Sequence, residues 1–196
     1  MSVPASDDVL VLESLGDPAR FAGVFDRHAA AVFAFLARRV GRDGAEDLLG
    51  EVFRIAFERR GSYRPDAPSA RPWLFGIAAN LVHRRRRSEV RELAALARLN
   101  GRTSPSTDPM ASSAGQLDDR VRLGQAARAL ERLPTEERDA LLLYAWEELT
   151  YAEIAVAQDV PTGTVRSRIS RARARLRAAL SDSTPDLVNL GDDDGH

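Results

Sequence analysis

The sequence of 196 residues contains no cysteine and no lysine. Without cysteine the chain has no disulfide framework, no thiolate metal site and no cysteine nucleophile, which fits a protein of the reducing cytoplasm. All 28 basic residues other than histidine are arginine, so every permanent positive side-chain charge is a planar guanidinium, a group suited to binding phosphates.

The chain also lacks the features of a membrane or secreted protein. It has no run of eighteen apolar residues, which a membrane-spanning helix needs. Its N-terminus, MSVPASDDVLVLE, is acidic and has neither the basic start nor the apolar run of a secretory signal. We therefore predict no membrane insertion and a cytoplasmic location.

The sequence also lacks the arrangements of residues that are typical of enzyme active sites. The three histidines are scattered, and there is no phosphate-binding glycine loop. The adjacent acids Glu46–Asp47 and Glu147–Glu148 point in different directions on a helix, so they make poor acid/base couples. The sequence predicts no enzymatic activity, no cofactor and no metal site.

The residues that are present predict an all-α protein. Apolar residues recur at helical spacing, and no segment shows the alternation of a half-buried strand. Gly41 is expected to end the first long helix, and the Pro- and Gly-rich loop 61–68 separates the second and third helices. The predicted helices cover about 18–40, 43–60, 70–99, 117–133 and 135–146, followed by two more within 149–180.

Composition divides the chain into parts. Residues 100–116 (NGRTSPSTDPMASSAGQ) are polar and rich in helix breakers, as expected of a flexible linker. Residues 181–196 carry five aspartates and no basic residue, which predicts an acidic, disordered tail. The predicted organisation is an N-terminal extension (1–17), a first helical domain (18–99), the linker (100–116), a second helical domain (117–180) and the tail (181–196).

The segment LTYAEIAVAQDVPTGTVRSRISRARARLRAAL predicts a helix, a tight turn and a longer helix. Thr150 and Glu153 have the spacing of a capping box, and Asp159 suits a turn position with left-handed geometry. Thr162 or Thr164 is placed to cap the second helix. A turn of this length between two amphipathic helices is typical of a helix-turn-helix unit.

The longer helix carries six arginines and no acid. On a helical wheel its apolar residues form one stripe, which is the face that packs, and a row of arginines flanks the stripe on each side. The opposite face has only Ser167, Ser170 and Ala174, so the helix can approach a DNA groove while both rows contact phosphates. A solvated basic helix is the simpler alternative. The rows are Arg166, Arg173 and Arg177 on one side, and Arg168, Arg171 and Arg175 on the other.

Charge is distributed unevenly over the rest of the chain. His83–Arg87 (HRRRR) forms a second basic cluster, and acids gather in Asp43–Glu51. Two basic sites and one acidic site on one chain favour a protein that binds nucleic acid and a protein partner.

Taken together, these segments resemble the bacterial RNA polymerase sigma factors. LERLPTEERDALLLYAWEELTYAEIAVAQDVPTGTVRSRISRARARL is similar to their region 4, and most similar to the small extracytoplasmic-function (group IV) sigma factors. FDRHAAAVFAFLARRV, GAEDLLGEVFRIAF and RPWLFGIAANLVHRRRR match region 2 in the same order. The resemblance covers about 21–91 and 118–180. It implies binding to core RNA polymerase, recognition of the −35 and −10 elements of promoter DNA, and help in promoter melting; an anti-sigma factor is a commonly expected partner of the group.

The resemblance also implies roles for individual residues. Acids after Gly44 resemble the surface that docks on the polymerase clamp helices, with Leu48 facing the core. Asn80 has the amide donor and acceptor for a base edge, and Tyr63 is a candidate for stacking, whereas Trp73 is expected mainly in the core. The predicted polymerase-binding set is Glu46, Asp47, Leu48 and Glu51, and the predicted −10 set is Tyr63, Asn80, His83, Arg84, Arg85, Arg86 and Arg87.

For the −35 element the resemblance points to the arginine-rich helix. Arg166 and Arg171 are candidates for guanine edges, and the other arginines for phosphates. The sequence departs from the family at Gln158–Asp159, where an apolar residue and glycine are usual, and at Ser170, where a larger side chain is common. The predicted −35 set is Thr162, Thr164, Arg166, Ser167, Arg168, Ser170, Arg171, Arg173 and Arg175.

Two other hypotheses remain open at this point. An autonomous operator-binding regulator would use only the helix-turn-helix unit, would normally need a dimer, and would leave the N-terminal motifs unexplained. A sigma-like protein that no longer drives transcription is allowed by the two departures. About twenty coil residues span at most roughly 65 Å, against about 70 Å for two turns of duplex, so two-site binding would need help from polymerase.

Overall fold

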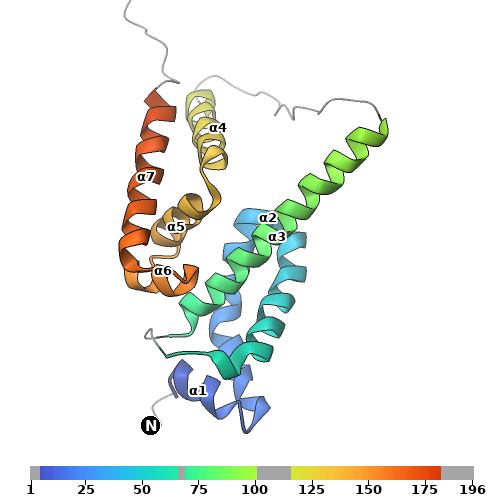
Figure 1. The fold of residues 1–196 in the computed structure, drawn as a ribbon, viewed down its shortest axis with the longest axis vertical. Helices are drawn as coiled ribbons and strands as arrows, with labels where there is room; N and C mark the ends of the chain where they lie inside the picture. Colours follow the sequence, from blue (N-terminus) through green and yellow to red (C-terminus); the bar gives the residue numbers. More distant parts are fainter. Residues whose placement is uncertain (1–4, 66–68, 101–115, 182–196) are drawn as a thin grey trace, which may run out of the picture.

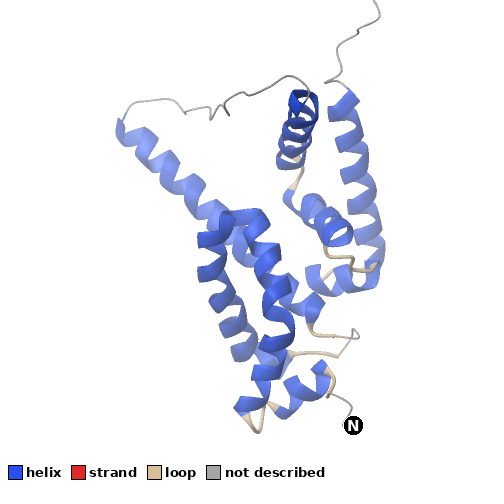
Figure 2. Cartoon of the chain, turned by 180° about the vertical axis from the view of Figure 1, so that it is seen from behind, coloured by secondary structure: helices blue, strands red, loops and turns tan. Residues whose placement is uncertain are grey.

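The computed structural model describes residues 5–65, 69–100 and 116–181, and every regular element in these ranges is helical (Figures 1 and 2). The all-α prediction is confirmed. The predicted linker residues 101–115 and tail residues 182–196 lie outside the described ranges. In chain order the elements are α1 (Asp7–Glu13), η1 (Pro18–Phe21), α2 (Ala22–Arg59), η2 (Arg60–Ser62), α3 (Arg71–Asn100), α4 (Gln116–Arg132), α5 (Thr135–Trp146), α6 (Tyr151–Gln158) and α7 (Thr162–Ser181).

Helices α1 to α3 form an N-terminal bundle in which α2 packs against α3. The chain leaves the helical conformation at Gly41, with φ 76° and ψ 171°, so the break predicted there is confirmed. Glycine adopts this positive φ without the strain that a Cβ would add. The core of the bundle includes Phe35 and Phe75, both fully buried, whose ring centroids are 5.1 Å apart. Phe25 lies four positions after the buried Phe21, yet it is 43% exposed and packs edge-on against Phe53.

The predicted N-terminal extension is in fact part of this bundle. Leu10 and Val11 of α1 are buried in the same core as α2 and α3. Asp7 is also buried, and its carboxylate accepts a hydrogen bond from the backbone N–H of Ala70 at 2.9 Å. The sequence did not reveal α1, because seven residues are too few for a helical period to be recognised.

The Asp7 carboxylate also pairs with Arg27 at 2.9 Å and with His28 at 2.6 Å. Burial alone would raise the pKa of Asp7, but the Ala70 N–H, Arg27 and His28 outweigh it and lower the pKa below the usual 3.8. Because the folded-state pKa is depressed, this group contributes stability above a pH of about 4, and the contribution is lost as the pH falls through the folded-state value.

We expect Asp7→Asn to lower the free energy of unfolding at pH 7 by about 1–3 kcal/mol, because buried donors lose a charged acceptor. Urea unfolding at pH 7 and pH 3 measures this, and the gap between variant and wild type should shrink at pH 3. Asp26→Asn, which removes an exposed acid of α2, is the control. A gap of the same size at both pH values would contradict the prediction.

Helices α4 to α7 form a C-terminal bundle, in which α7 packs against α4, α5 and α6. The predicted capping box is confirmed: the N–H of Glu153 donates to Thr150 Oγ1 at 3.2 Å, and the N–H of Thr150 donates to Glu153 Oε2 at 2.8 Å. Asp159 is left-handed, with φ 51° and ψ 52°, as predicted for the turn. Ile154 of α6 packs in the shared core with Val165 and Ile169 of α7.

The two bundles contact each other through α3 and α6 (Figure 1). Gly76 of α3 faces the backbone of α6 so closely that a Cβ at this position would overlap the carbonyl oxygen of Ala157. Buried apolar residues of both bundles belong to one continuous cluster. Within the described ranges, none of the helices has the length and apolarity that a membrane span requires.

Candidate nucleic-acid interface

Helix α7 has one buried apolar face and one exposed polar face, as its sequence predicts. Val165, Ile169 and Ala172 are at most 1% exposed and pack inward. The opposite face is exposed at Ser167 and Ser170, and the hydroxyl of Ser167 donates to the carbonyl of Gly163 on the same helix. At the start of the helix Thr162 is exposed and Thr164 is half-buried. The small exposed face lets this helix approach a groove with arginines on both sides.

One edge of α7 is bound to neighbouring helices; we call it the Arg168 edge, consisting of Arg168, Arg171 and Arg175. Arg168 Nη1 donates to Gln158 Oε1 of α6 at 2.8 Å. Arg171 Nε lies 3.0 Å from Glu137 Oε1, and Arg175 Nε lies 3.2 Å from Glu137 Oε2. Each arginine of this edge therefore has a polar or charged partner outside α7.

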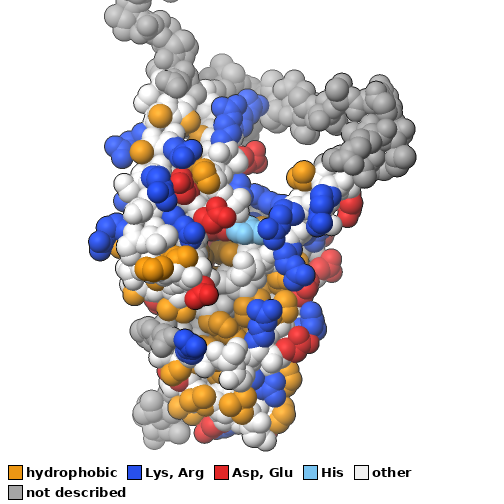
Figure 3. Space-filling model, in the orientation of Figure 1, with side chains coloured by type: hydrophobic (Ala, Val, Ile, Leu, Met, Phe, Trp, Pro, Cys, Tyr) orange, Lys and Arg blue, Asp and Glu red, His pale blue; other side chains and the backbone are white. Residues whose placement is uncertain are grey.

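The other edge, which consists of Arg166, Arg173 and Arg177 and is called the Arg166 edge, has weaker contacts. The Arg173 guanidinium lies over the ring of Tyr144 at 5.1 Å, and Arg177 Nε donates to the carbonyl of Arg173 at 3.4 Å. Arg166 is exposed and forms no ion pair with any residue that the structure describes. The Arg166 edge thus keeps its charge available for phosphates. Figure 3 shows basic side chains on the side of the molecule where α7 lies.

A groove of about 940 Å³ lies beside the contact between α3 and α6 and is lined by Asn80, which was predicted to bind a base edge of the −10 element. Asn80, on α3, and Arg64 are exposed at this groove, and Trp73 also lines it. The opposite wall includes Val156 and Thr162, so the structure brings predicted −10 and −35 residues together at one site. Trp73 is half-buried against the core, as predicted.

Tyr63 does not have the exposed position that stacking on a base requires. It is only 8% exposed, and its hydroxyl donates to Asp8 Oδ1 at 2.6 Å. Its ring packs on Trp73 with centroids 5.0 Å apart. Tyr63 therefore connects α1 to the loop before α3. The sequence pattern does not indicate this contact, because it does not indicate α1.

The basic cluster His83–Arg87 is divided between solvent and protein. Arg84 and Arg87 are exposed, whereas the other three side chains are partly covered. Arg85 Nε pairs with Glu89 at 3.0 Å, and Arg86 Nη2 donates to the carbonyl of Arg39 at 3.5 Å. His83 Nε2 forms an ion-pair contact with Asp139 of α5. In this arrangement only Arg84 and Arg87 are available to DNA phosphates.

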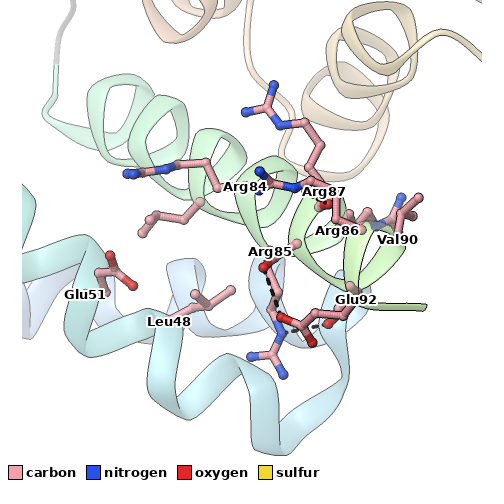
Figure 4. A pocket seen from close by; sticks show the side chains of 12 residues that line it. Leu48, Glu51, Arg84, Arg85, Arg86, Arg87, Val90 and Glu92 are labelled. Atoms are coloured by element: carbon pink, nitrogen blue, oxygen red, sulfur yellow. Dashed lines mark hydrogen bonds and ion pairs between the residues drawn. The ribbon is translucent and has the colours of Figure 1, made fainter. Parts of the chain in front are cut away.

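The acids predicted to bind polymerase lie on the second half of α2. Glu46 and Asp47 are exposed, and Leu48 is 6% exposed with its side chain toward α3, as predicted. Leu48 and Glu51 line a groove of about 1170 Å³, across which lie the arginines of α3 (Figure 4).

A set of charged side chains, in which the two acids are buried, connects the two bundles. We call it the interdomain ion-pair cluster; it is formed by Arg38, Arg39, Arg71, His83, Asp139 and Glu147. Glu147 is 3% exposed, contacts Arg38 of α2, and lies 3.7 Å from Arg71 of α3. Burial lowers the pKa of Arg39 to about 10, although Asp139 and Glu147 act in the opposite direction. The acids come from the C-terminal bundle and the bases from the N-terminal one. Sequence patterns gave no sign of this cluster, since both acids lie on an ordinary amphipathic helix or at its end.

Two parts of the chain match known sigma-factor regions. Residues 24–92 match Sigma-70 region 2, and residues 123–176 match Sigma-70, region 4. RNA polymerase sigma factor CarQ of Myxococcus xanthus is 34% identical over 164 residues, which cover 83% of this chain and 90% of CarQ. The chain belongs to the sigma-70 family.

Further relatives place this sigma factor in the extracytoplasmic-function group. The ECF RNA polymerase sigma-E factor of Escherichia coli strain K12 is 31% identical over 182 residues, which cover 90% of this chain and 95% of that protein. The sigma factor RpoE, solved in complex with the anti-sigma factor NepR from Bartonella quintana, has a TM-score of 0.57 at 27% identity, covering 84% of this chain and 98% of that chain.

As a sigma factor the protein binds core RNA polymerase and directs it to promoters to initiate transcription. Sigma factors are DNA-binding initiation factors rather than enzymes. An autonomous operator-binding regulator would need only the helix-turn-helix unit, so the region 2 match over α2 and α3 favours the sigma factor over that alternative.

Proposed function

We propose that α7 binds the −35 element, that the α3 face around Asn80 binds the −10 element, and that exposed acids of α2 contact core polymerase. The observation that carries the proposal is the exposed face of α7. It presents Ser167 and Ser170 between two arginine edges, which suits a helix that enters the major groove. Glu46 and Asp47 are free of ion pairs with any described residue, so their charges are available to a basic partner.

The −10 set becomes smaller when burial is taken into account. We retain Asn80 for a base edge and Arg84 and Arg87 for phosphates, since all three are exposed. Tyr63 is left out because its ring and hydroxyl are used inside the bundle. His83, Arg85 and Arg86 have protein partners and would reach DNA only after those contacts break.

Promoter binding requires the two bundles to separate. Asn80 and Thr162 line one groove, whereas −35 and −10 elements two helical turns apart are separated by about 70 Å. The described arrangement therefore corresponds to the free sigma factor, and the segment 101–115 would join two domains that move apart on polymerase. The N-terminal domain then includes α1, because Asp7 and Leu10 pack within it.

The remaining expectations follow from the family. An anti-sigma factor is an expected partner, since the similar RpoE was solved in complex with one. Action on RNA polymerase implies a cytoplasmic location. No enzymatic activity is expected, and the described residues contain no group of three or more metal-binding side chains.

The assignments can be tested by transcription of fragmented genomic DNA with core polymerase of the source organism, followed by sequencing of RNA 5′ ends. Wild type should produce start sites that share two upstream motifs. Arg166→Ala is expected to reduce output from these promoters about tenfold or more, because one good base contact contributes about 1–3 kcal/mol. Asn80→Ala should weaken the preference at the −10 motif.

Arg20→Ala is the control, since it removes an exposed arginine of η1 that pairs with Glu13 and lies outside every proposed binding set. It should leave transcription unchanged. Normal output and unchanged motifs with both Arg166→Ala and Asn80→Ala would refute the site assignment while leaving the membership of the family intact.

A further inference from the structure

The Arg168 edge of α7 differs from an ordinary basic surface in the number of its partners. Long arginine side chains on a helix usually sample many rotamers, and ordering them on DNA costs entropy. Here Arg168, Arg171 and Arg175 each contact a side chain from α5 or α6. The contacts order the three guanidinium groups before any ligand binds.

Glu137 is the acid behind two of these contacts. It lies in the first turn of α5 and is 7% exposed, and its Oε2 atom is buried with no hydrogen bond from the described residues. A buried carboxylate without a cation nearby is strongly disfavoured, so its pairing with Arg171 and Arg175 is needed where it lies. In both ion pairs the arginine atom nearest the carboxylate is Nε.

Gln158 orders the third arginine. Its Oε1 accepts from Arg168 Nη1 at 2.8 Å, and its Nε2 donates to the carbonyl of Glu136 at 3.2 Å. The amide therefore connects α5 to α7 across the turn of the helix-turn-helix unit. An apolar residue at position 158, which is usual in the family, would provide neither hydrogen bond.

We propose that Glu137 and Gln158 are positioning residues that determine −35 sequence preference by orienting the Arg168 edge; this rests on the proposed function of α7. An arginine whose Nε lies against a carboxylate can offer its two Nη atoms as a pair of donors, which matches the O6 and N7 acceptors of guanine. An unbound arginine instead reaches phosphates with little regard to sequence. Arg171, with its Nε closest to the buried carboxylate, is the arginine expected to select guanine.

The test uses the complete sigma factor with core polymerase on a promoter library whose −35 positions are randomised. Glu137→Gln keeps the shape of the side chain and removes its charge, and Gln158→Leu introduces an apolar residue. Each is expected to reduce discrimination between the preferred and the other −35 bases by about tenfold. Transcription from the poorest sequences should stay equal or rise, because released arginines bind phosphates.

Glu136→Gln is the matched control, since Glu136 is the neighbouring acid of the same first turn but is exposed and forms no ion pair with the described residues. It changes net charge and the helix terminus in the same way and should leave discrimination unchanged. A merely structural role of Glu137 would lower all transcription together without changing the base preference.

A double-mutant cycle with Arg171→Gln distinguishes failure of the positioning role from failure of the proposed function of α7. If Glu137 acts through Arg171, then Glu137→Gln should have little further effect on discrimination in the Arg171→Gln background. Unchanged discrimination in Glu137→Gln and Gln158→Leu, with a loss in Arg171→Gln, would overturn the positioning role alone. Unchanged discrimination in all three variants would overturn both the positioning role and the assignment of α7 to the −35 element. If Glu137→Gln does not fold, base discrimination measured with Gln158→Leu tests the positioning role instead.

Discussion

Replacing Gly76 with alanine is expected to separate the two bundles of the free sigma factor. A Cβ at position 76 would overlap the carbonyl oxygen of Ala157 and come within 3.2 Å of its carbonyl carbon. Because the opposing atoms are backbone, no side-chain rotation relieves the overlap, and α6 must move away from α3. Overpacking of this kind costs about 1–3 kcal/mol, equivalent to roughly a 5- to 150-fold change in the ratio of closed to open molecules.

The N-terminal bundle itself should tolerate Gly76→Ala, because alanine is more favourable than glycine inside a helix by about 1 kcal/mol. The absence of native cysteines allows dyes to be attached at Ala30→Cys on α2 and Ala178→Cys on α7, both exposed positions. Energy transfer between the dyes should fall clearly in the variant. Gly50→Ala is the control, since a Cβ there meets nothing within 4 Å.

Opening should also widen access to the groove beside Asn80. We therefore expect the free Gly76→Ala protein to bind single-stranded −10 DNA several-fold more tightly than wild type does, because base stacking and phosphate contacts become accessible. Energy transfer equal to that of wild type would show that the α3–α6 contact does not hold the bundles together.

Replacing Glu147 with glutamine is expected to weaken the closed arrangement and to reduce its dependence on salt. Glu147 is 3% exposed and is the acid shared by Arg38 and Arg71. Hydrogen bonds to charged groups contribute about 1.5–3 kcal/mol. Both arginines are more than a third exposed, so screening reduces the expected loss to about 1 kcal/mol, or roughly fivefold in the ratio of closed to open molecules.

The same dye pair measures the effect between 0.05 M and 0.5 M NaCl. Wild type should open progressively with salt, since the screening length falls well below about 10 Å over this range. The Glu147→Gln protein should start more open and respond less to salt. Glu58→Gln, which removes an exposed ion pair within α2, is the control and should behave as wild type. An identical salt response in Glu147→Gln and wild type would contradict a role for this acid in closure.

Burial of Arg39 explains why the interdomain ion-pair cluster needs its acids. Burial lowers the pKa of Arg39 to about 10, and Asp139 and Glu147 offset part of that desolvation. When polymerase or DNA separates the bundles, the arginines and His83 regain solvent, so opening exposes a basic surface next to Asn80. If the bundles separate as proposed, we expect closure and DNA binding to compete for these side chains.

The elements of the fold were largely predictable because they depend on residues three or four positions apart. The helix boundaries, the capping box of Thr150 and Glu153, the break at Gly41 and the left-handed Asp159 are each specified by neighbours in the chain. The inward stripe of α7 follows from the same periodicity. Phe25, four positions after the buried Phe21, is exposed nevertheless, so helical phase alone does not tell how far a bundle core extends.

The sequence by itself determined the helices, the order of the two sigma regions and the arginine-rich face of α7, since these are local patterns. Only the tertiary structure decided which charged groups are free. Arg38 contacts Glu147 from 109 positions away, Tyr63 donates to Asp8 across 55, and Arg171 pairs with Glu137 of another helix. Such contacts depend on how helices pack, and packing is set by buried surfaces summed over the whole chain rather than by the spacing of any one motif.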